Sequence, residues 1–202
     1  MRLTATSFVT LDGVMQSPGA PEEDPRDGFD LGGWLPPHFD DQTGQYMAGV
    51  FEHVDAFLLG RFTYETFASY WPNVTDPADP ISGALNKLPK YVVTGTLTDL
   101  AWNNSHPITG DIVKEVTELK QQPGRELQIH GSATLIHHLT DNGLIDVFRV
   151  LTFPVVLGRG KRLFANGVTP TAFKLTDIQT TGSGVVMHTY EAAGQPSFGS
   201  VV

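Results

Sequence analysis

Two short segments of this sequence combine a glycine with hydroxyl-bearing side chains directly after an apolar run. They are Gly60-Arg61-Phe62-Thr63-Tyr64-Glu65 and Gly131-Ser132-Ala133-Thr134. Glycine lets a ligand approach the backbone closely, and a helix that starts there presents unpaired N–H groups to an anion. The guanidinium of Arg61 adds a forked donor to the first segment. Two helix starts that face one crevice suit a diphosphate, whereas ordinary helix capping explains each segment taken alone.

A third segment, Thr94-Gly95-Thr96, also follows an apolar run and suits a ribose or an adenine. The sequence contains no G-x-x-x-x-G-K-[ST] motif, so a P-loop hydrolase is not supported. A strict G-x-G-x-x-G is also missing after the first expected strand, which removes the usual Rossmann fingerprint. The neighbouring pair His137-His138 cannot chelate one ion as histidines four residues apart on a helix do, and we predict no metal site.

The elements that must position these segments alternate between strands and helices. Apolar runs and alternating patterns predict strands, and apolar residues three and four positions apart predict helices. The expected strands cover residues 3–11, 56–59, 91–94, 127–130, 146–157, 173–180 and 185–191, and the expected helices cover residues 39–54, 63–70, 111–122 and 133–141. Long loops are expected over residues 17–37 and 72–80. This order indicates an α/β fold with a mostly parallel central sheet and antiparallel C-terminal strands at one edge.

Composition narrows the class of protein. The 202 residues suit one domain, residues 1–202, with a core over residues 2–191 and a tail over residues 192–202. The net charge is −9 and the basic residues do not cluster, so we expect no nucleic-acid partner. The chain has no cysteine, which excludes disulfides and thiolate chemistry. No apolar run has the length of a signal peptide core or a membrane span, and we therefore expect a cytoplasmic protein without a membrane partner.

The order of these segments resembles the dihydrofolate reductase superfamily. The run Leu58-Leu59-Gly60-Arg61-Phe62-Thr63-Tyr64-Glu65 looks like the cofactor loop of dihydrofolate reductases, and Gly131-Ser132 resembles their second, glycine-containing pyrophosphate loop. The segments Ser7–Gly13 and Gly143–Gly160 are closer to the reductase domain of the bifunctional riboflavin-biosynthesis deaminase/reductases. The resemblance covers residues 2–191. It implies a three-layer dihydrofolate reductase-like fold, a nicotinamide cofactor (NADPH, with NADH as the alternative) and a homodimer.

The resemblance also implies where the cofactor binds. The segments that match Gly60–Tyr64 and Gly131–Leu135 hold its phosphates in that family, the segment that matches Thr94–Thr96 lies near the adenosine ribose, and the one that matches Asp12–Met15 lies by the nicotinamide. On this basis the expected cofactor-binding residues are Gly13, Val14, Gly60, Arg61, Thr63, Tyr64, Thr94, Gly95, Thr96, Gly131, Ser132, Ala133, Thr134 and Leu135. Many relatives carry an arginine at the position of Gly95, and Arg61 is the candidate to compensate.

Other candidates concern the substrate. A proton must reach a ring that accepts a hydride, and Asp41 or Asp40 is the candidate catalytic residue. The alternative is that these carboxylates only stabilise a helix N-terminus through its dipole. We expect Asp12, Trp34 and Asp41 to bind substrate. The alternatives are that Asp12 only forms a turn and that Trp34 anchors the long loop by burying a large apolar area.

These expectations predict an NAD(P)H-dependent reductase that transfers a hydride to a small heteroaromatic substrate, of the pterin or ribosylaminopyrimidine type. A deaminase would need cysteine ligands for zinc, so no deaminase part is expected in this chain. A protein from another class also fits, namely a nicotinamide-nucleotide or other ligand-binding protein of the same fold without turnover, because a fold alone does not define a function.

Overall fold

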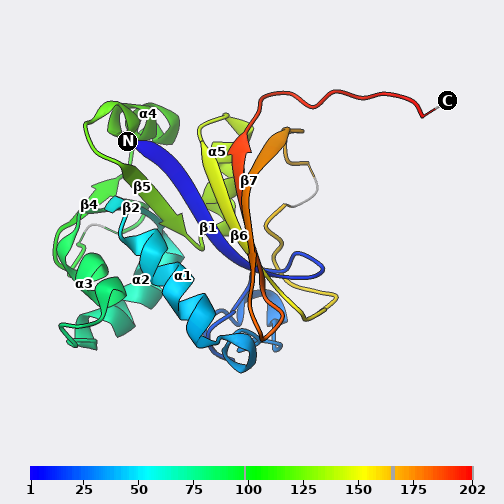
Figure 1. Cartoon of the computed structure of the whole chain (residues 1–202). Helices are drawn as coiled ribbons and strands as arrows, with labels where there is room; N and C mark the ends of the chain where they lie inside the picture. Colours follow the sequence, from blue (N-terminus) through cyan, green and yellow to red (C-terminus); the bar gives the residue numbers. More distant parts are fainter. Residues whose placement is uncertain (98, 165–166, 202) are drawn as a thin grey trace.

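The computed structural model describes residues 1–97, 99–164 and 167–201, and an eight-stranded sheet forms the centre of this described part (Figure 1). The strand order is β4-β3-β2-β5-β1-β6-β8-β7. Neighbouring strands from β4 to β6 are parallel, whereas β6-β8 and β8-β7 are antiparallel. The strands are β1 (Arg2–Thr10), β2 (Val54–Gly60), β3 (Lys90–Val93), β4 (Ser105–Ile108), β5 (Glu126–His130), β6 (Val147–Phe153), β7 (Phe173–Thr180) and β8 (Val186–Ala192). This arrangement confirms the predicted fold class.

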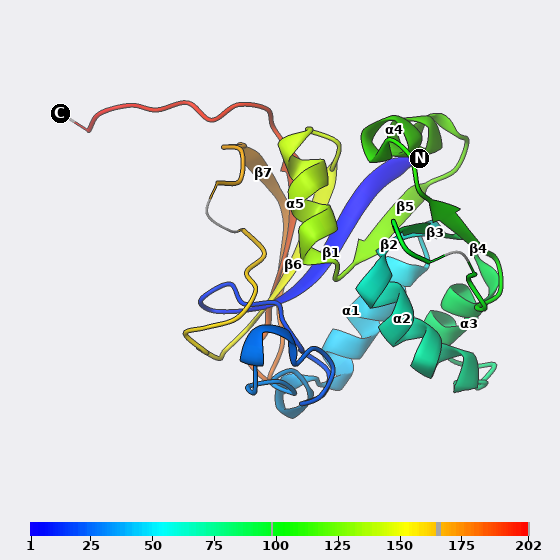
Figure 2. The same cartoon turned by 180° about the vertical axis from the view of Figure 1, so that it is seen from behind.

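Helices cover both faces of the sheet, as continuous apolar strands such as β2 require. One buried cluster packs α4 and α5 against β1 and β5 through residues such as Leu119, Ile136 and Ile129. The other packs α1, α2 and α3 against β2 and β6 through residues such as Phe51 and Leu151. Figures 1 and 2 show these layers from opposite sides. The helices are α1 (Asp41–Phe51), α2 (Arg61–Tyr70), α3 (Pro80–Lys87), α4 (Ile112–Gln121) and α5 (Ala133–Asp141), with short 3-10 turns at Arg26–Gly28, Pro36–His38 and Trp71–Asn73.

The connections diverge at the boundary between β2 and β5. After β2 the chain passes through α2 and α3 to β3 on one side, and after β5 it passes through α5 to β6 on the other. The strands β2 and β5 are parallel neighbours, so their carboxyl ends meet at one edge of the sheet. An edge where helices leave in opposite directions opens a crevice, and open α/β sheets bind their ligands there.

The structure differs from the sequence predictions at four places. Helix α3 occupies the end of the expected loop over residues 72–80 and continues to Lys87, and its first turn is capped by the carboxylate of Asp79. Strand β4 was not predicted, because its four residues Ser105–Ile108 include a proline and only one is buried. Helix α2 starts at Arg61 without any intervening loop. Strand β6 ends at Phe153 and not at residue 157, because Pro154 has no N–H to donate to the sheet.

The far edge of the sheet is open. Seven of the eight residues of β7 are exposed, and among them Leu175 and Ile178 are apolar. The segment after β8 leads away from the body of the molecule (Figure 1). The expected homodimer is not tested by these observations and stays a prediction. Among the described residues, no helix combines the length and the apolar composition needed to cross a membrane.

Candidate functional site

Gly60 and Gly131 lie side by side at the carboxyl ends of β2 and β5. The parallel register pairs Phe57 with Gln128, and the same step along both strands leads to the two glycines. The hydroxyl of Ser132 then joins the two corners directly. Its Oγ accepts a hydrogen bond from the N–H of Gly60 at 2.9 Å and donates one to Oγ1 of Thr63 at 2.8 Å. The two predicted anion sites therefore form one site, which we call the glycine corner and define as residues 60–63 and 131–135.

The backbone conformation explains why this corner contains small residues. Gly131 and Ser132 both adopt left-handed conformations, with φ of 65° and 60°. A Cβ atom on Gly131 would lie 3.5 Å from Oγ1 of Thr63, and one on Gly60 would lie 3.2 Å from Oγ of Ser132. The left-handed backbone favours glycine at position 131, and at position 60 a Cβ would press against the hydroxyl of Ser132. Gly60 and Gly131 therefore allow helices α2 and α5 to begin next to each other.

Neither helix is capped by a side chain at its N-terminus. The first-turn N–H groups of an α-helix lack partners inside the helix. In the described part of the chain no acceptor from elsewhere replaces them at residues 61–63 of α2 or residues 133–135 of α5. Six amides thus converge with the positive ends of two helix dipoles, an arrangement that favours an anion with two phosphate groups.

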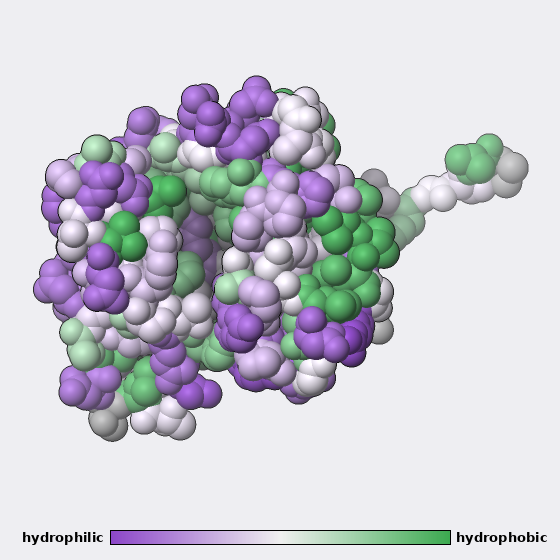
Figure 3. Space-filling model, turned by 90° about the horizontal axis from the view of Figure 1, so that it is seen from below, coloured by the Kyte–Doolittle hydropathy of each residue, from purple (hydrophilic) through white to green (hydrophobic). Residues whose placement is uncertain are grey.

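The edge of the sheet that carries this corner is hollowed. Figure 3 looks along the parallel strands toward their carboxyl ends and shows a depression near the middle of that face, with hydrophilic groups inside it. Apolar groups gather on the right of the same view. The connections of β2 and β5 diverge at this same edge, which is where open α/β sheets bind their ligands.

The segment Thr94–Thr96 continues this edge on the β3 side. Gly60 pairs with Val93 in the register, so Thr94 follows one residue beyond the corner. Oγ1 of Thr94 accepts from the N–H groups of Thr96 at 3.2 Å and Leu97 at 2.9 Å, which fixes the turn. Gly95 and Thr96 are exposed. Arg61 is half exposed and forms a surface ion pair with Glu65 at 3.4 Å, a type of pair that is weak in solution.

The side chains of two expected cofactor residues lie in the interior. The ring of Tyr64 is buried, and its hydroxyl accepts a hydrogen bond from the N–H of Trp102 at 3.0 Å. The side chain of Leu135 packs in the core beneath α5, while its amide belongs to the first turn of that helix. The expected role of both residues in cofactor binding stays a prediction.

Asp12, Gly13 and Val14 form a second corner, and it is closed. The carboxylate of Asp12 accepts from Oγ1 of Thr10 at 2.6 Å, from the N–H of Gly158 at 2.8 Å and from Arg162 at 3.3 Å. The hydroxyl of Thr10 and the backbone amides of Gly158 and Leu157 hold the pKa of this carboxyl at about 2, although burial opposes the shift. The amide of Gly13 donates to the carbonyl of Thr10, and Val14 is fully buried. The turn interpretation of Asp12 therefore holds, while contact with the nicotinamide or the substrate stays a prediction.

Trp34 anchors the long loop after β1. Its indole is 6% exposed, it packs edge-on against Phe153 with ring centroids 5.6 Å apart, and its Nε1–H donates to the carbonyl of Gln16 at 2.9 Å. This burial supports the alternative that Trp34 anchors the loop, and the expected contact with a substrate stays a prediction.

Asp40 and Asp41 begin α1 and are not part of the glycine corner. Asp40 caps the helix, because its Oδ1 accepts from the N–H and the hydroxyl of Thr43, both at 2.9 Å. Its Oδ2 accepts from the N–H of Ser183 in the β7–β8 turn at 3.1 Å. The amide of Thr43 is the main reason why the pKa of Asp40 lies well below its ordinary value. Asp41 is exposed on the first turn. Their expected catalytic role stays a prediction, and the structure supports the helix-capping alternative for Asp40.

Two further residues, His130 and Arg26, lie near the glycine corner, and only Arg26 carries no signal in the sequence. His130 precedes Gly131, stacks on Phe51 and shares a 3.0 Å hydrogen bond between its Nε2 and Oε1 of Gln128. Burial lowers its pKa to about 3, so the ring stays neutral and structural. The guanidinium of Arg26, in the loop after β1, lies 3.6 Å above the ring centre of Phe62 in α2. No periodic pattern marks Arg26, and only the folded path of the loop brings it there. Among the described residues, no group of three or more acidic or histidine side chains is placed to hold a metal ion.

Comparisons with known proteins agree with this geometry. The model of the RibD C-terminal domain matches residues 2–187. The uncharacterized protein YyaP of Bacillus subtilis is 33% identical over 143 residues, which cover 70% of this chain and 76% of YyaP. A putative riboflavin biosynthesis protein from Shewanella sp. PV-4 has a TM-score of 0.72 at 22% identity over 96% of this chain and 99% of its own. The dihydrofolate reductase of Enterococcus faecalis, solved with NADP(H), has a TM-score of 0.59 at 12% identity over 95% and 96%. The fold is thus that of dihydrofolate reductase, and the chain belongs to the RibD C-terminal domain family.

Proposed function

We propose that this protein is an NADPH-dependent reductase of a small heteroaromatic substrate, of the pterin or ribosylaminopyrimidine type. The observation that carries this proposal is the convergence of two uncapped helix N-termini, joined by the hydroxyl of Ser132, at one hollowed edge of the sheet. The family membership and the fold shared with a dihydrofolate reductase that was solved with NADP(H) support it.

The residues present fit a dinucleotide. The amides of residues 61–63 and 133–135 offer donors for a diphosphate, and the absence of a side chain on Gly60 and Gly131 leaves room for it. Thr94–Thr96 lies next to this corner, where an adenosine ribose would extend. Arg61 is close enough along the same edge to contribute charge to a ribose phosphate, since only a weak surface pair with Glu65 engages it. We therefore expect NADPH to bind more tightly than NADH.

The bound nicotinamide would supply the hydride, and the protein would position the rings and exclude water. The closed corner at Asp12 holds the loop after β1 against the segment 157–163, so one wall of the crevice is rigid. His130, the last residue of β5, is kept neutral by burial, which lowers its pKa to about 3, so it adds no positive charge next to Gly131. The glycine corner contains no carboxylate, so no residue in it stands out as the donor of the proton.

This last feature favours a second candidate function, a nucleotide-binding protein without turnover. The two predicted acids lie at the start of α1, and Asp40 is already engaged by Thr43 and Ser183. Such a protein would keep the amides that bind a diphosphate but would lack a general acid.

One experiment separates the two. Titration with NADPH, followed by tryptophan fluorescence or calorimetry, is expected to show binding in both cases. Oxidation of NADPH, followed at its own absorbance with a panel of pterins, flavins and aminopyrimidine ribosides, is expected only for the reductase. Tight binding of NADPH without its oxidation across the panel would support the binding protein without turnover. If the protein bound neither NADPH nor NADH, both proposed functions would be refuted.

A further inference from the structure

The loop after β1 is fixed on the same edge of the sheet as the glycine corner. Oγ of Ser17 accepts from the N–H of Asp24 at 2.9 Å and donates to the carbonyl of Ala20 at 2.9 Å. The side-chain amide of Gln16 donates to the carbonyls of Asp24 and Arg26, each at 3.1 Å. Together with the buried indole of Trp34, these bonds give the loop one defined path, which fixes where Arg26 emerges.

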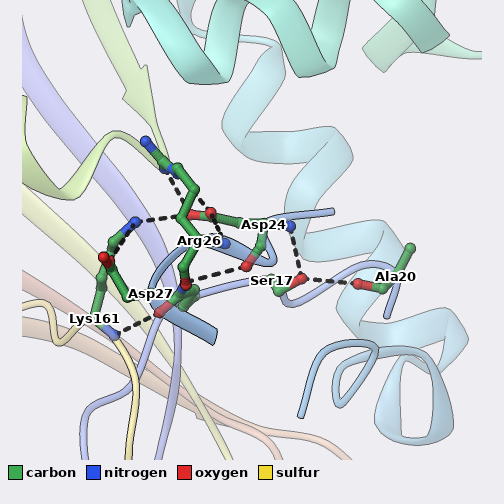
Figure 4. A network of polar contacts seen from close by, with 7 residues as sticks. Ser17, Ala20, Asp24, Arg26, Asp27 and Lys161 are labelled. Carbon is green, nitrogen blue, oxygen red and sulfur yellow. Dashed lines mark hydrogen bonds and ion pairs between the residues drawn. The ribbon is translucent and has the colours of Figure 1, made fainter. Parts of the chain in front are cut away.

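Asp24 holds two cations in place. Its carboxylate accepts from Nε and Nη2 of Arg26, both at 2.6 Å, and from Nζ of Lys161 at 3.2 Å, as Figure 4 shows. The side chain of Asp24 is only 9% exposed. Burial alone would raise its pKa, but the hydrogen bonds from Arg26 and Lys161 outweigh it and the pKa lies below its ordinary value. The carboxylate therefore stays ionised and keeps the guanidinium oriented, a bidentate geometry that lysine cannot reproduce.

The oriented guanidinium crosses from the loop to helix α2. It stacks on Phe62, the second residue of α2, at 3.6 Å from the ring centre. The amide of Phe62 is one of the unpaired donors of the glycine corner. Arg26 remains 47% exposed, and its Nη1 has no acceptor among the described residues. Arg61, the first residue of α2, forms only a weak surface ion pair with Glu65 at 3.4 Å.

We propose that Arg26 binds the diphosphate of the dinucleotide through its free edge, so that the loop after β1 forms a second, cationic wall opposite the amides of the glycine corner. The inference rests on the proposed function and adds a residue that sequence patterns do not mark. Two of its five donors fix it to Asp24, the ring of Phe62 supports its face, and the remaining donors are available to phosphate oxygens.

The test compares four proteins: wild type, Arg26→Gln, Arg26→Lys and, as a matched control, Lys161→Gln. Lys161 contacts the same carboxylate from the other side and has no contact with α2 among the described residues. Each protein is titrated with NADPH, with ADP-ribose, which keeps the diphosphate, and with nicotinamide mononucleotide, which lacks it. Thermal unfolding and circular dichroism report the integrity of the loop and of the fold.

We expect Arg26→Gln to weaken the binding of NADPH and of ADP-ribose by about tenfold or more, the effect of one lost charge-assisted contact. Binding of nicotinamide mononucleotide should change by less than about twofold, and the dependence of affinity on salt should become shallower. Arg26→Lys should recover part of the affinity, and Lys161→Gln should lower the melting temperature without changing affinity.

Three results would overturn the inference while leaving the proposed function intact. They are equal affinity of wild type and Arg26→Gln for ADP-ribose, an equal loss in Lys161→Gln, or an equal loss for nicotinamide mononucleotide. A wild-type protein that binds neither NADPH nor ADP-ribose would instead refute the proposed function together with the inference. If Arg26→Gln fails to fold, Arg26→Lys decides, because unchanged affinity for ADP-ribose in that variant would reject a contact that needs the guanidinium.

Discussion

Two corners at the same edge of the sheet look alike in sequence and differ in what their polar groups do. The glycine corner joins Gly60 and Gly131 and leaves six amides of two helix starts without acceptors. The corner at Asp12 also follows a strand and contains a glycine with positive φ, but its carboxylate and amides bond to one another and to the segment 157–163. The glycine corner is available to a ligand, whereas the corner at Asp12 holds neighbouring loops in place.

The difference lies in the balance of donors and acceptors. The hydroxyl of Ser132 joins the two turns and does not cap α5. The first amides of that helix therefore stay unpaired among the described residues. Asp12 does the reverse, because a single carboxylate satisfies Thr10, Gly158, Leu157 and Arg162. Unpaired donors with access to solvent attract an anion, whereas a saturated acceptor stabilises the fold. This comparison makes opposite predictions for substitutions in the two corners.

The largest effect is expected for Gly131→Val. A β-branched residue at φ of 65° strains the backbone, and its side chain would enter the space beside Thr63. We expect the affinity for NADPH to fall by about two orders of magnitude, a loss of about 3 kcal/mol in binding free energy. Gly143→Val is the matched control, since Gly143 has a φ of 64° and open space around it. Calorimetric titration should find normal affinity in the control, and a similar loss in both variants would mean that strain alone is responsible.

A smaller effect is expected for Ser132→Ala. This change removes the acceptor of the Gly60 amide and the donor to Thr63, so the two turns should move apart slightly. We expect about a threefold to tenfold weaker affinity for NADPH, and a loss of about 1 kcal/mol in unfolding free energy, typical of one hydrogen bond. Ser132→Gly also lacks the hydroxyl but adopts the left-handed backbone at φ of 60° without strain, so it should lose affinity for NADPH as Ser132→Ala does. Titration and urea unfolding measure both variants, and an affinity close to that of wild type in either one would contradict the role of the hydroxyl.

For Asp12→Asn we expect a change of stability rather than of binding. The N–H of Gly158 and Arg162 lose a charged acceptor, and the unfolding free energy at neutral pH should fall by about 1–3 kcal/mol. The folded pKa of about 2 lies below the ordinary value of 3.8, so the stabilisation by Asp12 is complete above that value and is lost as pH falls from about 4 to 2. Urea unfolding should therefore show a difference between wild type and Asp12→Asn that narrows with acidification. A constant difference would show that Asp12 is not ionised in these bonds.

The smallest effect is expected for Asp41→Asn. The side chain is exposed on the first turn of α1, and removal of its charge should change turnover with any active substrate by less than about twofold. Asp40→Asn should lower the melting temperature more than Asp41→Asn, because Asp40 caps the helix and accepts from Ser183. Loss of turnover in Asp41→Asn with unchanged NADPH affinity would restore the catalytic role predicted from sequence.

Sequence patterns predicted the parts of this molecule that depend on local periodicity and on residues at the ends of helices. The amphipathic face of α4 with its cap at Asp111 and the αL position of Gly143 after α5 follow local rules, and both are found in the structure. The spacing of Gly60 and Gly131 from their strands was enough to predict that they meet. In contrast, the closed state of Asp12 depends on acceptors and donors from residues 157–162, which no local rule connects to it. The position of Arg26 depends in the same way on loop bonds made by Gln16 and Ser17.

The place of β5 in the sheet ties the glycine corner to the central strand. β5 lies between β2 and β1 although it follows both in sequence, and Gly60 and Ser132 bond to each other across 72 positions. The corner is therefore complete only when β5 is paired with β2. Because a ligand that binds only the complete fold stabilises it, a dinucleotide bound there as proposed should protect the pairing of β5 against local unfolding.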